Sequence, residues 1–183
     1  AGTALEIVDI DGNVSISAAT AYIDFGAGTW AVGGTWTNAS TDAAWDAGTG
    51  SILFDAAAGG TMTFAGVNLA EAEFDDVTFT SMGGTPQTFT MATRGLRLGG
   101  TLTISDSVST TTLDTSVSNL AITAGPVTIG AGGIVTANGS TITISGNFNF
   151  SAGTFTFGTS TVVFAANGTL TTPGIVNTIY FFN

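Results

Sequence analysis

The sequence predicts an all-β protein, and more specifically a parallel β-solenoid (β-helix) with coils of about 20 residues. Three observations lead to this fold class. Short segments alternate hydroxyl and apolar side chains, these segments recur at regular intervals, and the 183 residues include 26 Gly. The alternative fold is a jelly-roll β-sandwich, a filament subunit joined by donor-strand exchange, because a sandwich also places strands roughly every 8–12 residues.

The strand signal is the alternation itself. Thr or Ser occupies one side of each segment and Val, Ile, Leu or Phe the other, as a half-buried strand requires. Thr is β-branched and favours the extended backbone, so it suits the wet face. The segments bounded by Gly, Asn or Asp are 61–64, 76–80, 87–91, 101–105, 126–130, 140–145 and 154–157.

The spacing of the apolar pairs predicts the coil. A period of about 20 residues with two or three short strands is typical of one β-solenoid coil. Successive pairs follow one another at close to this interval, with slightly uneven steps: Leu102/Ile104, Leu120/Ile122, Ile142/Ile144 and Val162/Phe164.

A longer internal similarity links two distant parts of the chain. WDAGTGSILF at 45–54 aligns with FTFGTSTVVF at 155–164, so Trp45 matches Phe155 and Gly48 matches Gly158. Upstream, GTWTNAS aligns with GNFNFSAG. Downstream, both copies pass through a Gly/Thr stretch to an aromatic strand.

These segments resemble the β-solenoid repeat regions of large secreted cell-surface, adhesin-like proteins of bacteria and archaea. The resemblance covers most of the chain and is weakest over residues 1–25. It is carried by GTWTNAS, AGTGSILFD, FDDVTFT, LGGTLTIS, GPVTIGAGGIVT, STITISGNFNFSAGTFTFGTSTVVFAANG and TIYFFN. The chain departs from the repeat pattern where Ala-Ala replaces Asn-Gly after an aromatic strand, in FDAAAGG and FAANG. The resemblance implies an extracellular structural or adhesive protein that is not an enzyme.

Composition excludes several classes of function. The chain lacks Cys and His, and Arg94 and Arg97 are its only basic residues. It therefore lacks the parts for a Ser–His or Cys–His nucleophile, a His/Cys zinc site or a disulfide scaffold. A net charge of −11 disfavours nucleic acid as a partner. No apolar stretch is long enough for a membrane helix, and a pI near 4.1 suits the cell exterior.

Both ends of the chain read as mid-coil strands without polar caps, in ALEIVDIDG and TIYFFN. Independent solenoids need such caps. We therefore expect residues 1–183 to form a single repeat domain. It is either a segment of a longer chain that packs on flanking repeats, or a subunit that polymerises with itself head to tail. An uncharged apolar end face would support the filament interpretations.

Two acidic segments are candidates for structural calcium, the one cofactor considered. Asp9, Asp11 and Asn13 place oxygen ligands at alternate positions, although Asp-Gly is also an ordinary turn. Glu71, Glu73 and Asp75 would share one strand face, with Asp76 opposite, and their default interpretation is a solvated acidic surface.

Trp30, Trp36 and Trp45 crowd the first third of the chain. Either they belong to the core, or they form a platform for surface glycans. A carbohydrate-binding or polysaccharide-cleaving β-helix module is therefore the functional alternative, which requires exposed Trp beside carboxylates; burial of Trp would count against it.

Five Asn-x-Ser/Thr triplets are candidate N-glycosylation sites, beginning at Asn13, Asn38, Asn138, Asn149 and Asn167.

Overall fold

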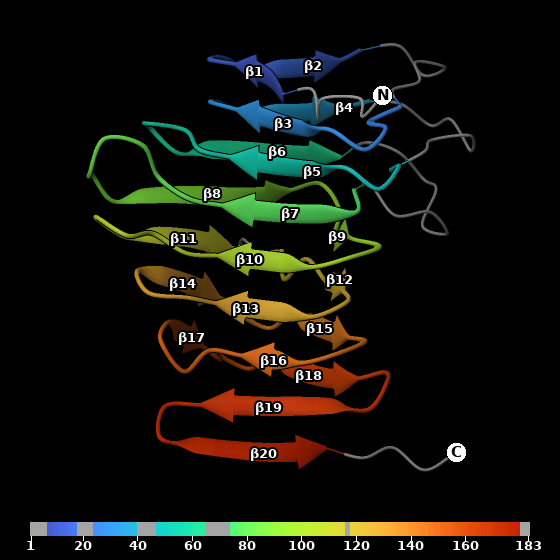
Figure 1. Ribbon diagram of the computed structural model, residues 1–183, viewed down its shortest axis with the longest axis vertical. Coiled ribbons are helices and arrows are strands. Elements are labelled where there is room, and N and C mark those ends of the chain that lie inside the picture. Colours follow the sequence, from blue (N-terminus) through green and yellow to red (C-terminus); the bar gives the residue numbers. More distant parts are fainter. Residues whose placement is uncertain (1–6, 18–23, 40–46, 65–73, 116–117, 180–183) are drawn as a thin grey trace, which may run out of the picture.

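The computed structural model describes residues 7–17, 24–39, 47–64, 74–115 and 118–179. Over these residues the chain winds into a parallel β-solenoid with three sheets and no helix. Strands of successive coils stack along one axis, with β1 at one end and β20 at the other (Figure 1). The all-β prediction and the solenoid prediction are confirmed. The jelly-roll alternative is wrong, because every pairing between described strands is parallel except β19 with β20.

The nine-stranded sheet forms one face of the stack from end to end. In stacking order its strands are β1 (Ile7–Ile10), β3 (Thr29–Val32), β5 (Ser51–Phe54), β7 (Asp76–Phe79), β10 (Leu102–Ile104), β13 (Val127–Ile129), β16 (Phe148–Asn149), β19 (Gly168–Thr172) and β20 (Ile175–Ile179).

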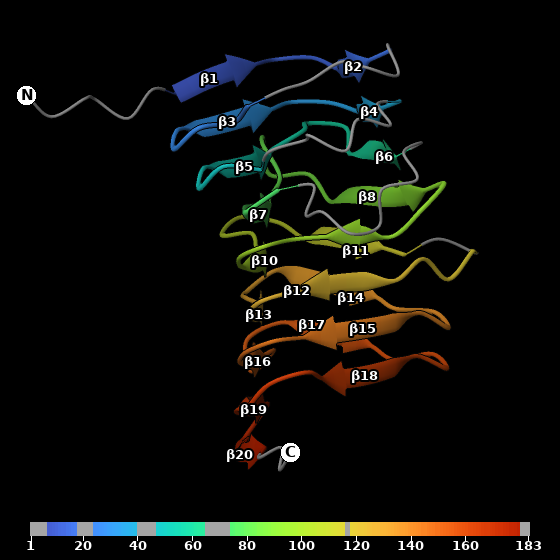
Figure 2. The same ribbon diagram turned by 90° about the vertical axis from the view of Figure 1, so that its right-hand side faces the viewer.

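The other two sheets close the coil, and both end before β19 (Figure 2). The seven-stranded sheet contains β2 (Val14–Ile16), β4 (Trp36–Asn38), β6 (Gly60–Phe64), β8 (Gln87–Ala92), β11 (Thr111–Asp114), β14 (Gly133–Thr136) and β17 (Thr154–Thr156). The four-stranded sheet contains β9 (Leu96–Arg97), β12 (Ile122–Ala124), β15 (Thr141–Ile144) and β18 (Thr161–Phe164).

Apolar ranks fill the interior because alternation along each strand turns one side chain of every pair inward. In the nine-stranded sheet one rank runs through paired, almost fully buried residues of five consecutive coils: Val32, Phe54, Phe79, Ile104 and Ile129. The rings of Phe54 and Phe79 stack with centroids 5.1 Å apart. Each such side chain contributes about 1.5–3 kcal/mol on burial, so the ranks hold successive coils together.

The coils vary in length more than the sequence predicted. The coil that joins Ile122 to its partner Ile142 is short, whereas the coil that joins Met62 to its partner Met91 is much longer. The difference arises at the corners, because the strands keep their register while the connections between them change length. The predicted period of about 20 residues therefore holds for the first and the last coils, while the middle coils are longer.

One predicted step between coils is wrong. Ile104 does not stack on Ile122, because β10 belongs to the nine-stranded sheet and β12 to the four-stranded one. Ile104 stacks on Ile129, and Ile122 stacks on Leu96. Periodic apolar pairs alone do not reveal which face of the coil a strand occupies.

The internal similarity between segments 45–54 and 155–164 is local. Gly48 and Gly158 both adopt positive φ, at 60° and 58°, and a Cβ on either would lie 2.3 Å from a carbonyl oxygen of the preceding coil. The strands that follow differ, since Phe54 lies in the nine-stranded sheet and Phe164 in the four-stranded sheet. The shared pattern thus encodes a corner and the strand after it, rather than a repeated position in the coil.

The last described strand also departs from the prediction. Of the predicted strand TIYFFN, residues 180–183 lie outside the described residues. Thr178 and Ile179 belong to β20, which runs antiparallel to β19 after a turn at Gly174, where φ is 77°. It therefore does not begin another coil.

Candidate functional site

The end of the solenoid at β17 and β18 is a cross-section of the apolar core that the described residues leave open. These strands are the last of their sheets, while β19 and β20 continue the third sheet beyond them. A hollow of about 200 Å³ lies there. Its lining is Phe148, Phe150, Phe157, Val162, Phe164, Leu170 and Thr172. The hollow has no charged side chain among these lining residues, and Asp114 is the last charged residue of the whole sequence.

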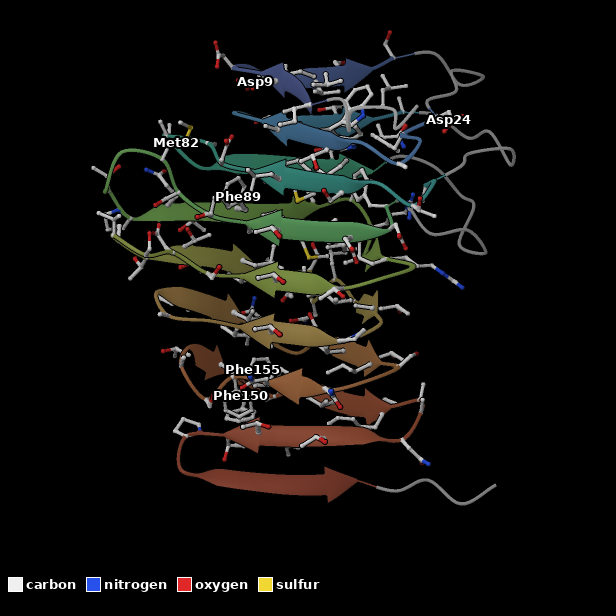
Figure 3. All side chains as sticks on the ribbon, viewed as in Figure 1. Asp9, Asp24, Met82, Phe89, Phe150 and Phe155 are labelled. Carbon is white, nitrogen blue, oxygen red and sulfur yellow. The ribbon has the colours of Figure 1, made fainter. Side chains whose placement is uncertain are left out.

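Four phenylalanines give this end a packed aromatic floor. Phe150 and Phe155 lie together close to β19 (Figure 3). The ring centroids of Phe148, Phe150, Phe155 and Phe157 lie 4.7–6.2 Å apart in edge-on and tilted pairs. Phe157 remains 55% exposed. An uncharged apolar end face is the feature that the filament interpretations require, but the sequence alone did not indicate which phenylalanines line it.

The opposite end of the stack is acidic. Asp9, Asp11 and Asp55 line a groove of about 270 Å³ together with the exposed Met82. Asp9 and Met82 are labelled in Figure 3. Burial raises the pKa of Asp55, and the charges of Asp9 and Asp11 raise it further. The groove therefore concentrates negative charge on neighbouring coils.

The predicted calcium loop is only partly assembled around this groove. Asp9 and Asp11 line it, but the Asn13 side-chain oxygen accepts a hydrogen bond of 2.8 Å from the backbone N–H of Thr35. Within the described ranges, no three Asp, Glu, His or Cys residues lie close enough together to hold a metal ion. Calcium at Asp9, Asp11 and Asn13 stays a prediction.

The second acidic candidate lies at the start of β7. Glu71 and Glu73 lie outside the described residues, so the predicted set with Asp75 stays untested. Asp76 is not opposite Asp75 as predicted: a Cβ on Gly100 would lie 3.0 Å from Asp75 Oδ1 and 2.3 Å from Asp76 Oδ1. Asp75 precedes the strand, so strand alternation does not separate the two carboxylates. Burial, followed by the charge of Asp76, raises the pKa of Asp75.

The tryptophans that the structure describes belong to the core side of the coil. Trp36 is fully buried, and its ring lies 5.3 Å from that of Phe74. Trp30 is partly buried against the core and meets Phe25 edge-on at 5.2 Å. Trp45 lies outside the described residues. Neither described tryptophan lines the acidic groove, so the arrangement required by the carbohydrate alternative is not formed by these residues.

Two of the five glycosylation triplets are held within the fold. Asn38 is 3% exposed, on an inward position of β4. Asn138 has a φ of 50°, and its Nδ2 donates hydrogen bonds to Asp114 Oδ1 at 2.9 Å and Thr115 Oγ1 at 3.2 Å. Ser140, which completes that triplet, is fully buried. Glycosylation of the folded chain at either position would require these contacts to open.

The other three triplets begin nearer the surface. Asn13 and Asn167 are exposed, and Asn149 is partly buried at the end of β16. At Asn149 the side-chain oxygen accepts hydrogen bonds from Ser151, the third residue of the same triplet. This contact distinguishes it from Asn13, whose side-chain oxygen bonds to another coil.

No family model matches the chain, and no curated protein or solved structure matches it. Among the described residues, no helix has the length and hydropathy needed to cross a membrane.

Proposed function

We propose that this chain is a structural or adhesive element of the cell exterior, part of a fibre or of a long surface protein. In this proposal its coils are continued beyond β17 and β18 by further coils, supplied by flanking repeats or by another copy. The observation that carries the proposal is the uncharged apolar hollow at that end.

The physical argument begins with what the hollow leaves open. Among the described strands, β17 and β18 each pair on one edge only, with β14 and β15. The other edge of a last strand presents N–H and C=O groups that are a ready template for another strand. Adding strands would satisfy these groups and bury Phe157 and Phe164, at roughly 25 cal/mol per Å² of apolar area.

Bonds between coils support a mechanical role. Asn13, Asn119 and Asn147 each accept, through the side-chain oxygen, a hydrogen bond from a backbone N–H 20 to 22 residues later, at 2.7–2.9 Å. Asp76 makes the same bond to Thr101 at 2.6 Å. These bonds add to the parallel ladders, so force along the axis is shared by the backbone and by side chains at the corners.

The charge distribution supports a directed assembly. All charged side chains lie at or before Asp114 in the sequence. An interface at the C-terminal end would therefore bring no like charges together, whereas two acidic ends would repel each other.

The carbohydrate alternative is the weaker proposal. Trp36, one of its three platform residues, is fully committed to the core.

The test is the assembly state of the purified chain, measured by light scattering over a range of concentrations and by electron microscopy. We expect concentration-dependent association, abolished by Phe157→Asp, which places a charge in the hollow. Val163→Asp is the matched control, because Val163 is exposed on the outer side of β18 between two lining residues. A stable monomer at every concentration, or equal loss of association in both variants, would overturn the form of the proposal in which other copies of this chain cover the hollow.

A further inference from the structure

The turn that follows β16 arranges an Asn-x-Ser triplet in an unusual way. Asn149 ends the strand, and its Oδ1 accepts a hydrogen bond of 3.0 Å from the Ser151 backbone N–H and one of 2.8 Å from the Ser151 hydroxyl. Ser151 is exposed. Between them, Phe150 is only 8% exposed and packs in the aromatic floor of the hollow. The buried ring anchors the turn, and the two polar residues lie on either side of it.

This arrangement leaves the amide nitrogen of Asn149 available. Both hydrogen bonds are made by the side-chain oxygen, and Nδ2 makes none with the described residues. A hydroxyl two residues after Asn is the feature that defines an acceptor triplet for N-glycosylation. Here that hydroxyl already contacts the amide group that it must assist.

Each of the three surface triplets shares residues with a strand: Asn149 itself ends β16, which is paired on both edges, and the other two triplets run into strands. Residues 167–169 run into β19, which is paired on one edge with β16 and on the other with β20. Residues 13–15 run into β2, which pairs with β4, and Asn13 is bonded to the next coil. A transferase must reach the Asn side chain and the hydroxyl of a triplet, and at 149–151 this requires the turn after β16 to open, because the Phe150 backbone N–H donates a hydrogen bond of 2.9 Å to the Thr171 carbonyl oxygen. Among the three surface triplets, the one at Asn149 has its second and third residues beyond the end of a described strand.

We propose that Asn149 is an acceptor for an N-linked oligosaccharide delivered to the folded chain from a lipid diphosphate carrier. In the transfer, Nδ2 of Asn149 forms a bond to the anomeric carbon of the sugar. The bond from that carbon to the diphosphate oxygen breaks, the lipid diphosphate leaves with the bonding electron pair, and one Nδ2 proton passes to a base of the transferase. Oxidation states do not change.

The position gives the glycan a defined place on the molecule. Asn149 stacks between Thr128 and Thr171 on the outward side of the nine-stranded sheet. The sugar would stand beside the open end without occupying its apolar hollow. This inference goes beyond the proposed structural role and does not depend on it.

The experiment incubates the purified, folded chain with a single-subunit oligosaccharyltransferase that has no sequence requirement outside the triplet, together with a lipid diphosphate-linked oligosaccharide. Peptide mapping by mass spectrometry then gives the occupancy of each triplet. A denatured sample is treated in parallel to show that the enzyme accepts the triplets once the fold is removed.

In the folded chain we expect modification at Asn149 at least tenfold above that at the other four triplets. Ser151→Ala should reduce it at least tenfold and Ser151→Thr should retain it, while Asn167→Gln, a control on the neighbouring coil, should leave it unchanged. Preferential modification of Asn13 or Asn167 in the folded chain would overturn the inference. So would an unmodified Asn149 in folded chains whose denatured counterpart is modified there. Circular dichroism of each variant separates loss of the acceptor from loss of the fold.

Discussion

The hydroxyl of Ser81 donates a hydrogen bond to the carboxylate of Asp106, 25 residues later and one coil further along the stack. The other oxygen of this carboxylate accepts hydrogen bonds from the backbone N–H groups of Val108 and Ser109, at 2.8 and 2.9 Å. Asp106 is only 6% exposed. One acidic side chain thus closes its own corner and binds the corner of the preceding coil.

Replacing this carboxylate should weaken the fold. Hydrogen bonds to a charged group contribute about 1.5–3 kcal/mol, so Asp106→Ala should lower the free energy of unfolding by at least that amount in urea titrations. Asp9→Ala is the control, since Asp9 is an exposed carboxylate. Equal effects of the two substitutions would contradict the structural role of Asp106.

Lowering the pH should remove the contribution of Asp106 to the stability of the fold. The hydrogen bond from Ser81 and those from the backbone lower the pKa of Asp106 from 3.8 to about 2. The unfolded chain therefore binds this proton at a higher pH than the folded chain does. The contribution of Asp106 is fully present above about pH 4 and is lost as the pH falls towards 2. Thermal melting at a series of pH values should show this loss in the parent chain, with a flatter acid limb in Asp106→Asn.

Asp55 should behave in the opposite sense. Its pKa is raised chiefly by burial and then by the charge of Asp9, so ionising it costs stability in the folded chain. Asp55→Asn should therefore raise the melting temperature at pH 7. The gain in the free energy of unfolding should stay below about 1 kcal/mol, as expected for partly solvated charges. The gain should vanish at low pH, where the parent side chain is also neutral. A variant that is less stable than the parent at pH 7 would show that the carboxylate makes a favourable contact there.

A glycine pair tests how closely the coils approach. Gly26 and Gly48 both have positive φ, at 59° and 60°. A Cβ on Gly48 would lie 2.3 Å from the Gly26 carbonyl oxygen, whereas a Cβ on Gly26 would meet nothing within 4 Å. Gly26→Ala should cost only the left-handed backbone, about 1–2 kcal/mol. Gly48→Ala should cost clearly more, because it also displaces the neighbouring coil. Urea denaturation of both variants measures the difference, and equal costs would argue against the close stacking.

The corner bonds of Asn147 can be tested by an isosteric change. Its Oδ1 accepts a hydrogen bond of 2.9 Å from the Thr169 backbone N–H. Asn147→Asp keeps an acceptor and should be tolerated, whereas Asn147→Ala should lose about 0.5–1.5 kcal/mol. Hydrogen exchange at Thr169, faster in the alanine variant alone, would locate the effect.

The fold was predictable from the sequence to the level of its strands. All seven segments chosen for alternation contain strands, because the inward and outward positions are written directly into Thr-x-Thr patterns. The assignment of strands to sheets was not predictable in the same way. It depends on the length of each corner, and a local apolar pair such as Leu102/Ile104 looks the same on any face.

The polar sites were harder to predict, because their partners lie a full coil away. Asp106 stands in a Ser-rich segment that reads as an ordinary turn, and its hydrogen bond from Ser81 joins it to the preceding coil. The reversal of β20 likewise depends on a turn at Gly174, which alternation does not report. Short-range patterns specify what each strand looks like, while contacts between one coil and the next decide where it sits.

All charged side chains lie in the part of the chain that ends at Asp114. The charge is therefore distributed unevenly along the axis of the solenoid. Added salt should act on one half of it: screening would relax the crowded carboxylates of the early coils and leave the later coils unaffected. In an electric field, or near a charged surface, such a molecule experiences a torque that rotates its long axis, in addition to a net electrostatic force. Its orientation would then be selected before any specific contact forms.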